Sequence, residues 1–154
     1  MANTYSQIFI QIVFVIAGRR NIIPQSHKEE LHKYITGIIR NKCQKLYAIN
    51  CMPDHVHILL SIKPNISLSD LVRDIKNNAT NFINKNEWAS GRFHWQRGFG
   101  AFSYSKSHID RVVKYIENQE RHHSKRSFNT EYLELLKKFD VEYDNRFIFK
   151  QEER

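Results

Sequence analysis

The feature that most constrains the fold of this chain is the regular alternation of side-chain types in residues 55–60, His-Val-His-Ile-Leu-Leu. In an extended strand, successive side chains point to opposite faces of the sheet. His55 and His57 are therefore expected side by side on one face, while Val56 and Ile58 point the other way into a core. Two adjacent imidazoles can hold a cation that polarises a phosphate oxygen. A His-x-His pair taken alone is nevertheless more often structural than metal-binding.

The rest of the sequence predicts an α+β fold in a single domain, because 154 residues suffice for one buried core. Hydrophobic periodicity and expected N-caps at Ser26, Ser67 and Ser107 define the elements. In order, they are a strand over Tyr5–Ala17, a helix from Ser26 to about Lys45, strands over Leu46–Cys51 and His55–Ile62, a helix from Ser67 to about Lys85, a strand over Ala101–Tyr104, and helices over about 108–121 and Thr130–Phe139. This order favours an antiparallel sheet covered by helices on one face.

Charge points to a polyanionic partner. The chain carries 24 Lys and Arg against 16 Asp and Glu, a formal net charge of +8. The basic groups are enriched in residues 92–126, which also contain several aromatic side chains. Two cysteines are too few for a disulfide framework, and the apolar run near the N-terminus is too short to span a membrane. We therefore expect a soluble, cytoplasmic protein that does not bind a membrane.

The helix expected over 108–121 carries a stripe of candidate catalytic residues beside its apolar face. At 100° per residue, Tyr115 and Gln119 lie one turn apart, with Arg111 on the same stripe. A phenol oxygen can attack a phosphate, an amide can complete the coordination of a metal, and a guanidinium can neutralise phosphate charge. A helical tyrosine is more often a packing residue, so the stripe gains weight only together with the histidine pair.

Three segments together resemble the HUH single-tyrosine transposases of small bacterial insertion sequences, a group that includes the REP-associated tyrosine transposases. They are His55-Val56-His57, the run Trp95-Gln96-Arg97-Gly98-Phe99-Gly100-Ala101-Phe102-Ser103, and the helix Tyr115-Ile116-Glu117-Asn118-Gln119-Glu120-Arg121-His122-His123. The resemblance extends from the first strand to Phe128. It implies a ferredoxin-like (RRM-like) sheet plus a helix with the catalytic tyrosine, all in one HUH domain over 1–154, with the tail from about residue 128 at the periphery.

The resemblance also implies a reaction, in which single-stranded DNA is cut and rejoined through a 5′-phosphotyrosine. Tyr115 is then the nucleophile, and His55, His57 and Gln119 are the ligands of Mg²⁺ or Mn²⁺. The energy kept in the phosphotyrosine ester makes a nucleotide cofactor unnecessary. Tyr104 is a second tyrosine on the preceding strand, but it has no Gln one turn later.

The implied partners are DNA hairpins in single strands and a second copy of the chain, since one tyrosine holds one DNA end. Basic and aromatic residues are the expected DNA contacts, by phosphate binding and base stacking. They are Arg92, Trp95, Arg97, Arg111, Lys114 and Arg121. Two alternatives remain open on sequence alone. One is a domesticated relative that processes genomic hairpins, and the other is a catalytically silent module that binds single-stranded nucleic acid.

Overall fold

The structure is a computed structural model that describes residues 3–19, 23–89, 91–123, 127–144 and 146. The strands in this part of the chain are β1 (Phe9–Val15), β2 (Lys45–Cys51), β3 (His55–Ser61) and β4 (Gly100–Tyr104). The α-helices are α1 (Lys28–Asn41), α2 (Leu68–Lys85), α3 (Ile109–Glu117), α4 (Gln119–His123) and α5 (Phe128–Lys138). No helix in the described residues is long and apolar enough to cross a membrane.

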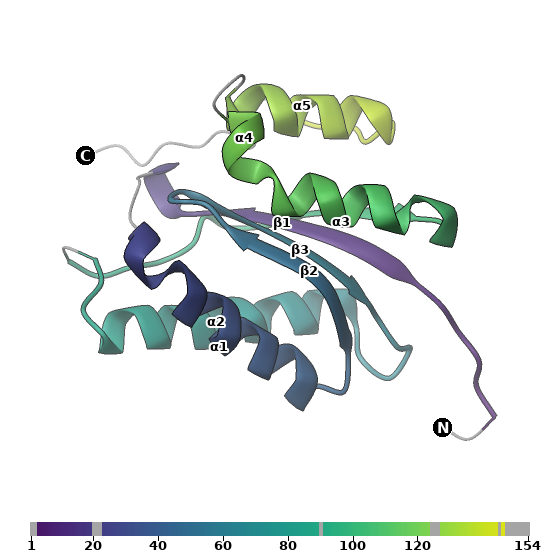
Figure 1. The fold of residues 1–154 in the computed structure, drawn as a ribbon, viewed down its shortest axis with the longest axis horizontal. Coiled ribbons are helices and arrows are strands. Elements are labelled where there is room, and N and C mark those ends of the chain that lie inside the picture. The colour runs from purple at the N-terminus through teal and green to yellow at the C-terminus, as the bar shows by residue number, and fades with distance from the viewer. Residues whose placement is uncertain (1–2, 20–22, 90, 124–126, 145, 147–154) are drawn as a thin grey trace.

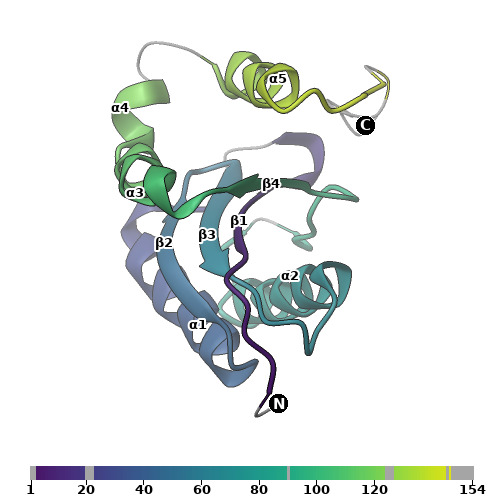
Figure 2. The ribbon, with the colours of Figure 1, turned by 90° about the vertical axis from the view of Figure 1, so that its right-hand side faces the viewer.

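The four strands form one antiparallel sheet in the order β2-β3-β1-β4. With α1 between β1 and β2 and α2 between β3 and β4, this is the split βαβ arrangement of ferredoxin-like folds. The α+β, ferredoxin-like architecture expected from the sequence is confirmed, but the expectation that the helices cover only one face of the sheet is corrected. Figures 1 and 2 show α1 and α2 on one face of the sheet, and α3 and α5 on the opposite face.

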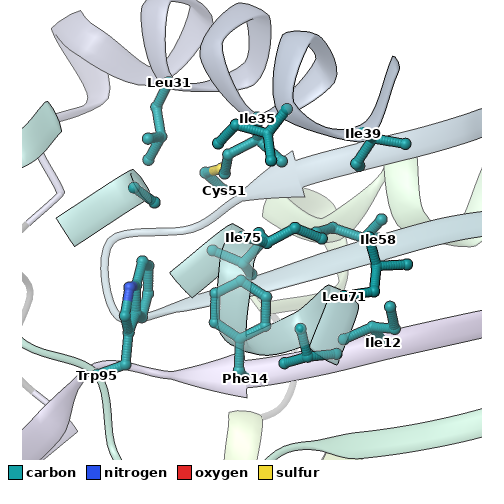
Figure 3. Packing of buried hydrophobic residues seen from close by; sticks show 14 of the residues in the cluster. Ile12, Phe14, Leu31, Ile35, Ile39, Cys51, Ile58, Leu71, Ile75 and Trp95 are labelled. Carbon is teal, nitrogen blue, oxygen red and sulfur yellow. The ribbon is translucent and has the colours of Figure 1, made fainter. Parts of the chain in front are cut away.

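The main core lies between the sheet and the pair α1 and α2. Alternation along β1 and β3 turns Ile12, Phe14 and Ile58 toward this layer, where they are at most 2% exposed. Figure 3 shows them packed against apolar side chains from the helices, which are Leu31, Ile35, Ile39, Leu71 and Ile75. Because β3 is also covered on its other face, its histidines are as deeply buried as its aliphatic residues.

The predicted helix over 108–121 is interrupted at Asn118. In the structure α3 ends at Glu117 and α4 begins at Gln119. The side chain of Asn50, on β2, donates a hydrogen bond to the carbonyl of Ile116 at 2.8 Å. A side chain that takes a carbonyl from the i to i+4 ladder is a common cause of a helix break. The interruption turns α4 away from the axis of α3, as Figure 1 shows.

Two expected N-caps differ from the structure. Ser26 lies in a 3-10 turn over Gln25–His27, and His27 precedes α1 without a side-chain cap. Ser107 likewise lies in a 3-10 turn over Lys106–His108, and its predicted capping role is wrong. Both serines are displaced from the cap because the short turn inserts residues before the α-helix begins. The cap at Ser67 is confirmed, since its hydroxyl accepts a hydrogen bond from the Asp70 amide.

Helix α5 is not peripheral, so the expectation of a peripheral tail is corrected for residues 128–138. Helix α5 buries Phe128, Leu135 and Leu136 against the sheet, in a second apolar cluster with residues of β1 and β4. The contact with β4 is so close that a Cβ built on Gly100 would lie 2.5 Å from the Tyr132 hydroxyl. The apolar stripe of α5 explains the docking, because leaving it exposed would cost the free energy gained by burial.

Candidate active site

The candidate site lies on the face of β3 that is covered by α3, α4 and α5 (Figure 2). Alternation along β3 places His55 and His57 on this face, at 1% and 0% exposure. His123 from α4 and Glu131 from α5 meet them there, and one potential ligand atom from each of the four residues lies within 4.8 Å of the others. Segments that are far apart in the sequence therefore assemble a compact cluster of three imidazoles and one carboxylate.

His55 presents an available lone pair to this cluster. Its Nδ1 donates to the Asp54 carboxylate at 2.6 Å, while its buried Nε2 has no hydrogen-bond partner among the described residues. Burial lowers the pKa of His55 to about 4, although the hydrogen bond to Asp54 opposes the shift. The ring is therefore neutral near pH 7, with the proton on Nδ1. A carboxylate that fixes the tautomer in this way is the usual support of a metal-binding histidine.

His57 faces an oxygen atom on each side of its ring. Its Nδ1 lies 3.2 Å from Oε1 of Gln11, and its Nε2 lies 3.0 Å from Oε1 of Glu131. The amide of Gln11 is oriented by its own hydrogen bond, since its Nε2 donates to the Tyr104 hydroxyl at 2.9 Å. A neutral imidazole has one N–H, so only one of these oxygens can be satisfied by it. The other ring nitrogen then presents a lone pair, which can bind a cation.

Glu131 links the histidines to the tyrosine. Its Oε1 contacts His57 and also His123 Nε2 at 3.4 Å. Its Oε2 accepts hydrogen bonds from the Tyr115 hydroxyl and from Gln119 Nε2. Burial raises the pKa of this carboxyl, but the hydrogen bonds from His123, His57 and Tyr115 outweigh it and hold the pKa well below its usual range. Glu131 is therefore an ionised carboxylate in a site only 1% exposed.

The structure brings together all four residues that the sequence singled out for chemistry. The rings of Tyr115 and His57 meet edge to face with centroids 6.1 Å apart. Gln119 is fully buried beside them, with its Oε1 at 2.9 Å from His123 Nε2. The one-turn spacing of Tyr115 and Gln119 survives the helix break, because Asn118 alone separates α3 from α4.

Two members of the cluster, His123 and Glu131, were missed by the sequence reasoning. His123 follows Gln119 by four residues, a spacing that places both on one face of a helix. Glu131 occupies the apolar stripe of α5 with Phe128, Leu135 and Leu136, where a lone carboxylate is a signal of function. The side chain of His122, from the same motif, lies outside the described part of the structure.

A groove of about 360 Å³ gives access to the tyrosine from solvent. Its lining includes Tyr104, His108, Arg111, Tyr115 and Lys138. Arg111 is thus the predicted DNA contact that lies beside the candidate nucleophile. The other predicted basic contacts, Arg92, Arg97, Lys114 and Arg121, are exposed.

Trp95 does not fit its predicted role as a base-stacking residue. It is 8% exposed and packs edge to face on Phe14 in the main core (Figure 3), and also edge to face on Phe93. Its Nε1 donates to the Lys76 carbonyl at 3.1 Å. The aromatic loop therefore closes the core, since an indole anchored at both its ring and its nitrogen has no free face for a nucleotide base.

Comparisons with known proteins bear on the family and the fold. The family model described as "Transposase IS200 like" matches residues 4–119. A solved structure of a REP-associated tyrosine transposase bound to a REP hairpin superposes with a TM-score of 0.61 at 16% identity, covering 99% of this chain and 95% of that chain. A candidate transposase from Deinococcus radiodurans R1 gives a TM-score of 0.60 at 20% identity, covering 76% and 94%. No curated protein sequence matches. At these identities the two structures show a shared fold.

Proposed function

This chain belongs to the IS200-like transposase family, and from that premise we propose that it cleaves and rejoins single-stranded DNA through Tyr115. The observation that carries the proposal is the Tyr115 hydroxyl, which is held by Glu131 at the edge of a buried cluster of histidines. A phenol beside such a cluster is suited to attack on a phosphodiester whose charge is neutralised nearby.

The cluster fits a divalent metal ion. The unpartnered Nε2 of His55 and the Nε2 of His57, which faces the Glu131 carboxylate, are the nitrogens that a cation between these rings would bind. His55, His57 and Gln119 are the proposed ligands, with Mg²⁺ or Mn²⁺ as the ion. Such an ion, when bound, polarises a phosphate oxygen and stabilises the charge that develops on it.

The proposed reaction is a transesterification. Tyr115 Oη forms a bond to phosphorus, the bond from phosphorus to the 3′-oxygen breaks, and the phenol proton ends on the released 3′-hydroxyl. One ester replaces another, so the step is reversible without a nucleotide cofactor. Glu131 stays ionised and orients the phenol by accepting its hydrogen bond, which places the nucleophile before the substrate arrives.

The proposed substrate is a hairpin with a single-stranded flank. The hairpin in the structure of the REP-associated relative supports this choice of probe. Arg111 lies in the groove that leads to Tyr115 and is the first candidate for a contact with the scissile phosphate. Arg92, Arg97, Lys114 and Arg121 are exposed and are proposed to bind the DNA backbone more remotely.

We include a homodimer in the proposal, because joining two DNA ends requires two tyrosines. Light scattering of the purified chain, alone and with a hairpin, tests it. A mass of two chains in the complex supports the proposal, and a monomer that still joins two ends contradicts it.

Covalent capture tests the proposed reaction. The chain is incubated with labelled hairpins taken from the flanks of its own gene and with Mn²⁺ or Mg²⁺, and the products are separated on a denaturing gel. We expect an adduct with the wild type that is lost with chelator and with Tyr115→Phe. Tyr34→Phe is the matched control, since Tyr34 packs on Phe82 on the opposite face of the sheet. Hairpin binding without any adduct would instead indicate a silent binding module.

A further inference from the structure

We propose that His123 and Glu131 are direct ligands of the metal ion and complete its site, together with His55 and His57, within a single chain. The proposal rests on the proposed function only for the role of the ion, which is to polarise a phosphate oxygen of the DNA. It adds the last two helices to the metal site and gives a donor set of three imidazole nitrogens and a carboxylate oxygen. Such a set favours transition metals, whereas an all-oxygen site favours Mg²⁺ and Ca²⁺.

The spacing of the donor atoms carries the proposal. Around an ion with bonds of about 2.1 Å, neighbouring ligand atoms lie about 3.0 Å apart in an octahedron and about 3.4 Å apart in a tetrahedron. Glu131 Oε1 lies 3.0 Å from His57 Nε2 and 3.4 Å from His123 Nε2. The carboxylate oxygen therefore sits at a corner shared by two ligand pairs, and one donor atom from each of the four residues lies within 4.8 Å of the others.

The charges around this point also favour a cation. The Glu131 side chain is almost fully buried, where an uncompensated negative charge is costly. His55 turns a neutral nitrogen toward it, and His57 meets it with the nitrogen opposite the one that faces Gln11. An ion between these groups would be held by the carboxylate and by lone pairs that are otherwise without a donor.

Gln119 is compatible with this arrangement. Its Oε1 lies 2.9 Å from His123 Nε2, close to the 3.0 Å that separates Glu131 Oε1 from His57 Nε2, so it can serve as an additional oxygen ligand. The distinctive claim is that the site does not depend on Gln119 alone for its third protein ligand. Removing His123 or Glu131 should weaken metal binding even when Gln119 is intact.

The donor set predicts the order of metal affinities. Mg²⁺ prefers oxygen ligands in an octahedron with several waters, whereas imidazole nitrogens favour transition metals. We expect Mn²⁺ to bind at least about tenfold more tightly than Mg²⁺, and Zn²⁺ more tightly than Mn²⁺, as the Irving–Williams order requires. Mn²⁺ is the useful probe because its paramagnetism reports both affinity and ligand type.

The experiment is a titration of the metal-free full chain with MnCl₂, in which free Mn²⁺ is measured by electron paramagnetic resonance. We expect one site in the wild type and, in both His123→Gln and Glu131→Gln, a loss of affinity greater than the about 10-fold to 100-fold that removal of an outer-shell partner causes. Glu134→Gln, one turn further along α5 at an exposed position, is the matched control and should bind Mn²⁺ like the wild type. Circular dichroism verifies that each variant is folded.

A spectroscopic readout keeps the test decisive if a variant is unstable. Pulsed electron paramagnetic resonance of the wild-type complex counts the nitrogen atoms bound to Mn²⁺, and we expect three imidazoles. Two nitrogens, or unchanged affinity in both folded variants, would overturn the proposal. An adduct at Tyr115 together with unchanged Mn²⁺ affinity in the variants would leave the proposed function standing and refute this inference alone. Loss of Mn²⁺ affinity in the variants, together with the absence of any covalent adduct, would support this inference and refute the proposed function.

Discussion

Gln11→Leu tests how the sheet orients the proposed metal-binding side of His57. Gln11 and His57 are both fully buried, and the amide Oε1 lies 3.2 Å from the imidazole Nδ1. With this oxygen as the acceptor of the Nδ1 proton, the lone pair of Nε2 is left for the proposed metal. Leucine has a similar volume but no acceptor. The ring then either buries an unsatisfied N–H or changes to the tautomer that cannot bind a metal through Nε2.

Both consequences have an expected size. A buried donor left without an acceptor costs about 1–3 kcal/mol of folding free energy. Loss of the group that orients a metal-binding histidine lowers affinity by about 10-fold to 100-fold. That loss corresponds to about 1.4–2.7 kcal/mol of binding free energy. Urea unfolding followed by circular dichroism measures the first quantity, and calorimetric titration with Mn²⁺ measures the second.

Tyr104→Phe and Gln11→Glu separate the two effects. Tyr104→Phe removes the hydroxyl that accepts from Gln11 Nε2 at 2.9 Å but keeps the acceptor of His57. We expect it to lower stability by about 1 kcal/mol and to leave the Mn²⁺ affinity unchanged. Gln11→Glu keeps an acceptor on Nδ1 and should retain metal binding. If Gln11→Leu binds Mn²⁺ like the wild type, or if Tyr104→Phe lowers affinity as much, the reasoning about the tautomer is wrong.

Three further predictions concern the core, a second histidine and the DNA interface. Phe14→Ala should lower the free energy of unfolding by about 3–5 kcal/mol in urea, because Phe14 is 2% exposed in the main core. Burial lowers the pKa of His32 to about 4. Between about pH 6.5 and 4, the unfolded chain therefore binds a proton on this histidine that the folded chain does not. The free energy of unfolding consequently falls as the pH falls through this range. Allowing for solvent screening, we expect a loss of about 1 kcal/mol between pH 7 and 5, which His32→Gln should reduce in urea unfolding at both pH values. Arg111→Ala should weaken hairpin binding and lower the slope of log affinity against log salt by about one, as measured by fluorescence anisotropy.

The sequence predicted most of the sheet and the histidine pair, because both depend on local patterns. The period-two alternation in β3 determines which side chains share a face, and no distant contact changes that. The α+β order followed from strand and helix periodicity for the same reason. Elements of this kind need only neighbouring residues to be recognised.

The parts that were missed depend on tertiary contacts. The break at Asn118 follows from a hydrogen bond between Asn50 and the Ile116 carbonyl, which are 66 residues apart. The burial of Trp95 depends on how its loop closes the core. The sequence could not indicate this, because aromatic residues among basic ones are equally typical of a surface that binds nucleic acid. Glu131 left a local signal, a charge within the apolar stripe of α5, but its partners were visible only once the fold was known.

The most direct measurement of the central claim is the identity of the residue that carries DNA. The covalent adduct formed with a hairpin substrate is digested with protease and nuclease, and the modified peptide is sequenced by mass spectrometry. We predict a nucleotide 5′-phosphate attached to Tyr115, the tyrosine that Glu131 holds beside the histidine cluster. Attachment to Tyr104, the other tyrosine that lines the groove, or cleavage to a free 5′-phosphate with no modified peptide, would contradict the account.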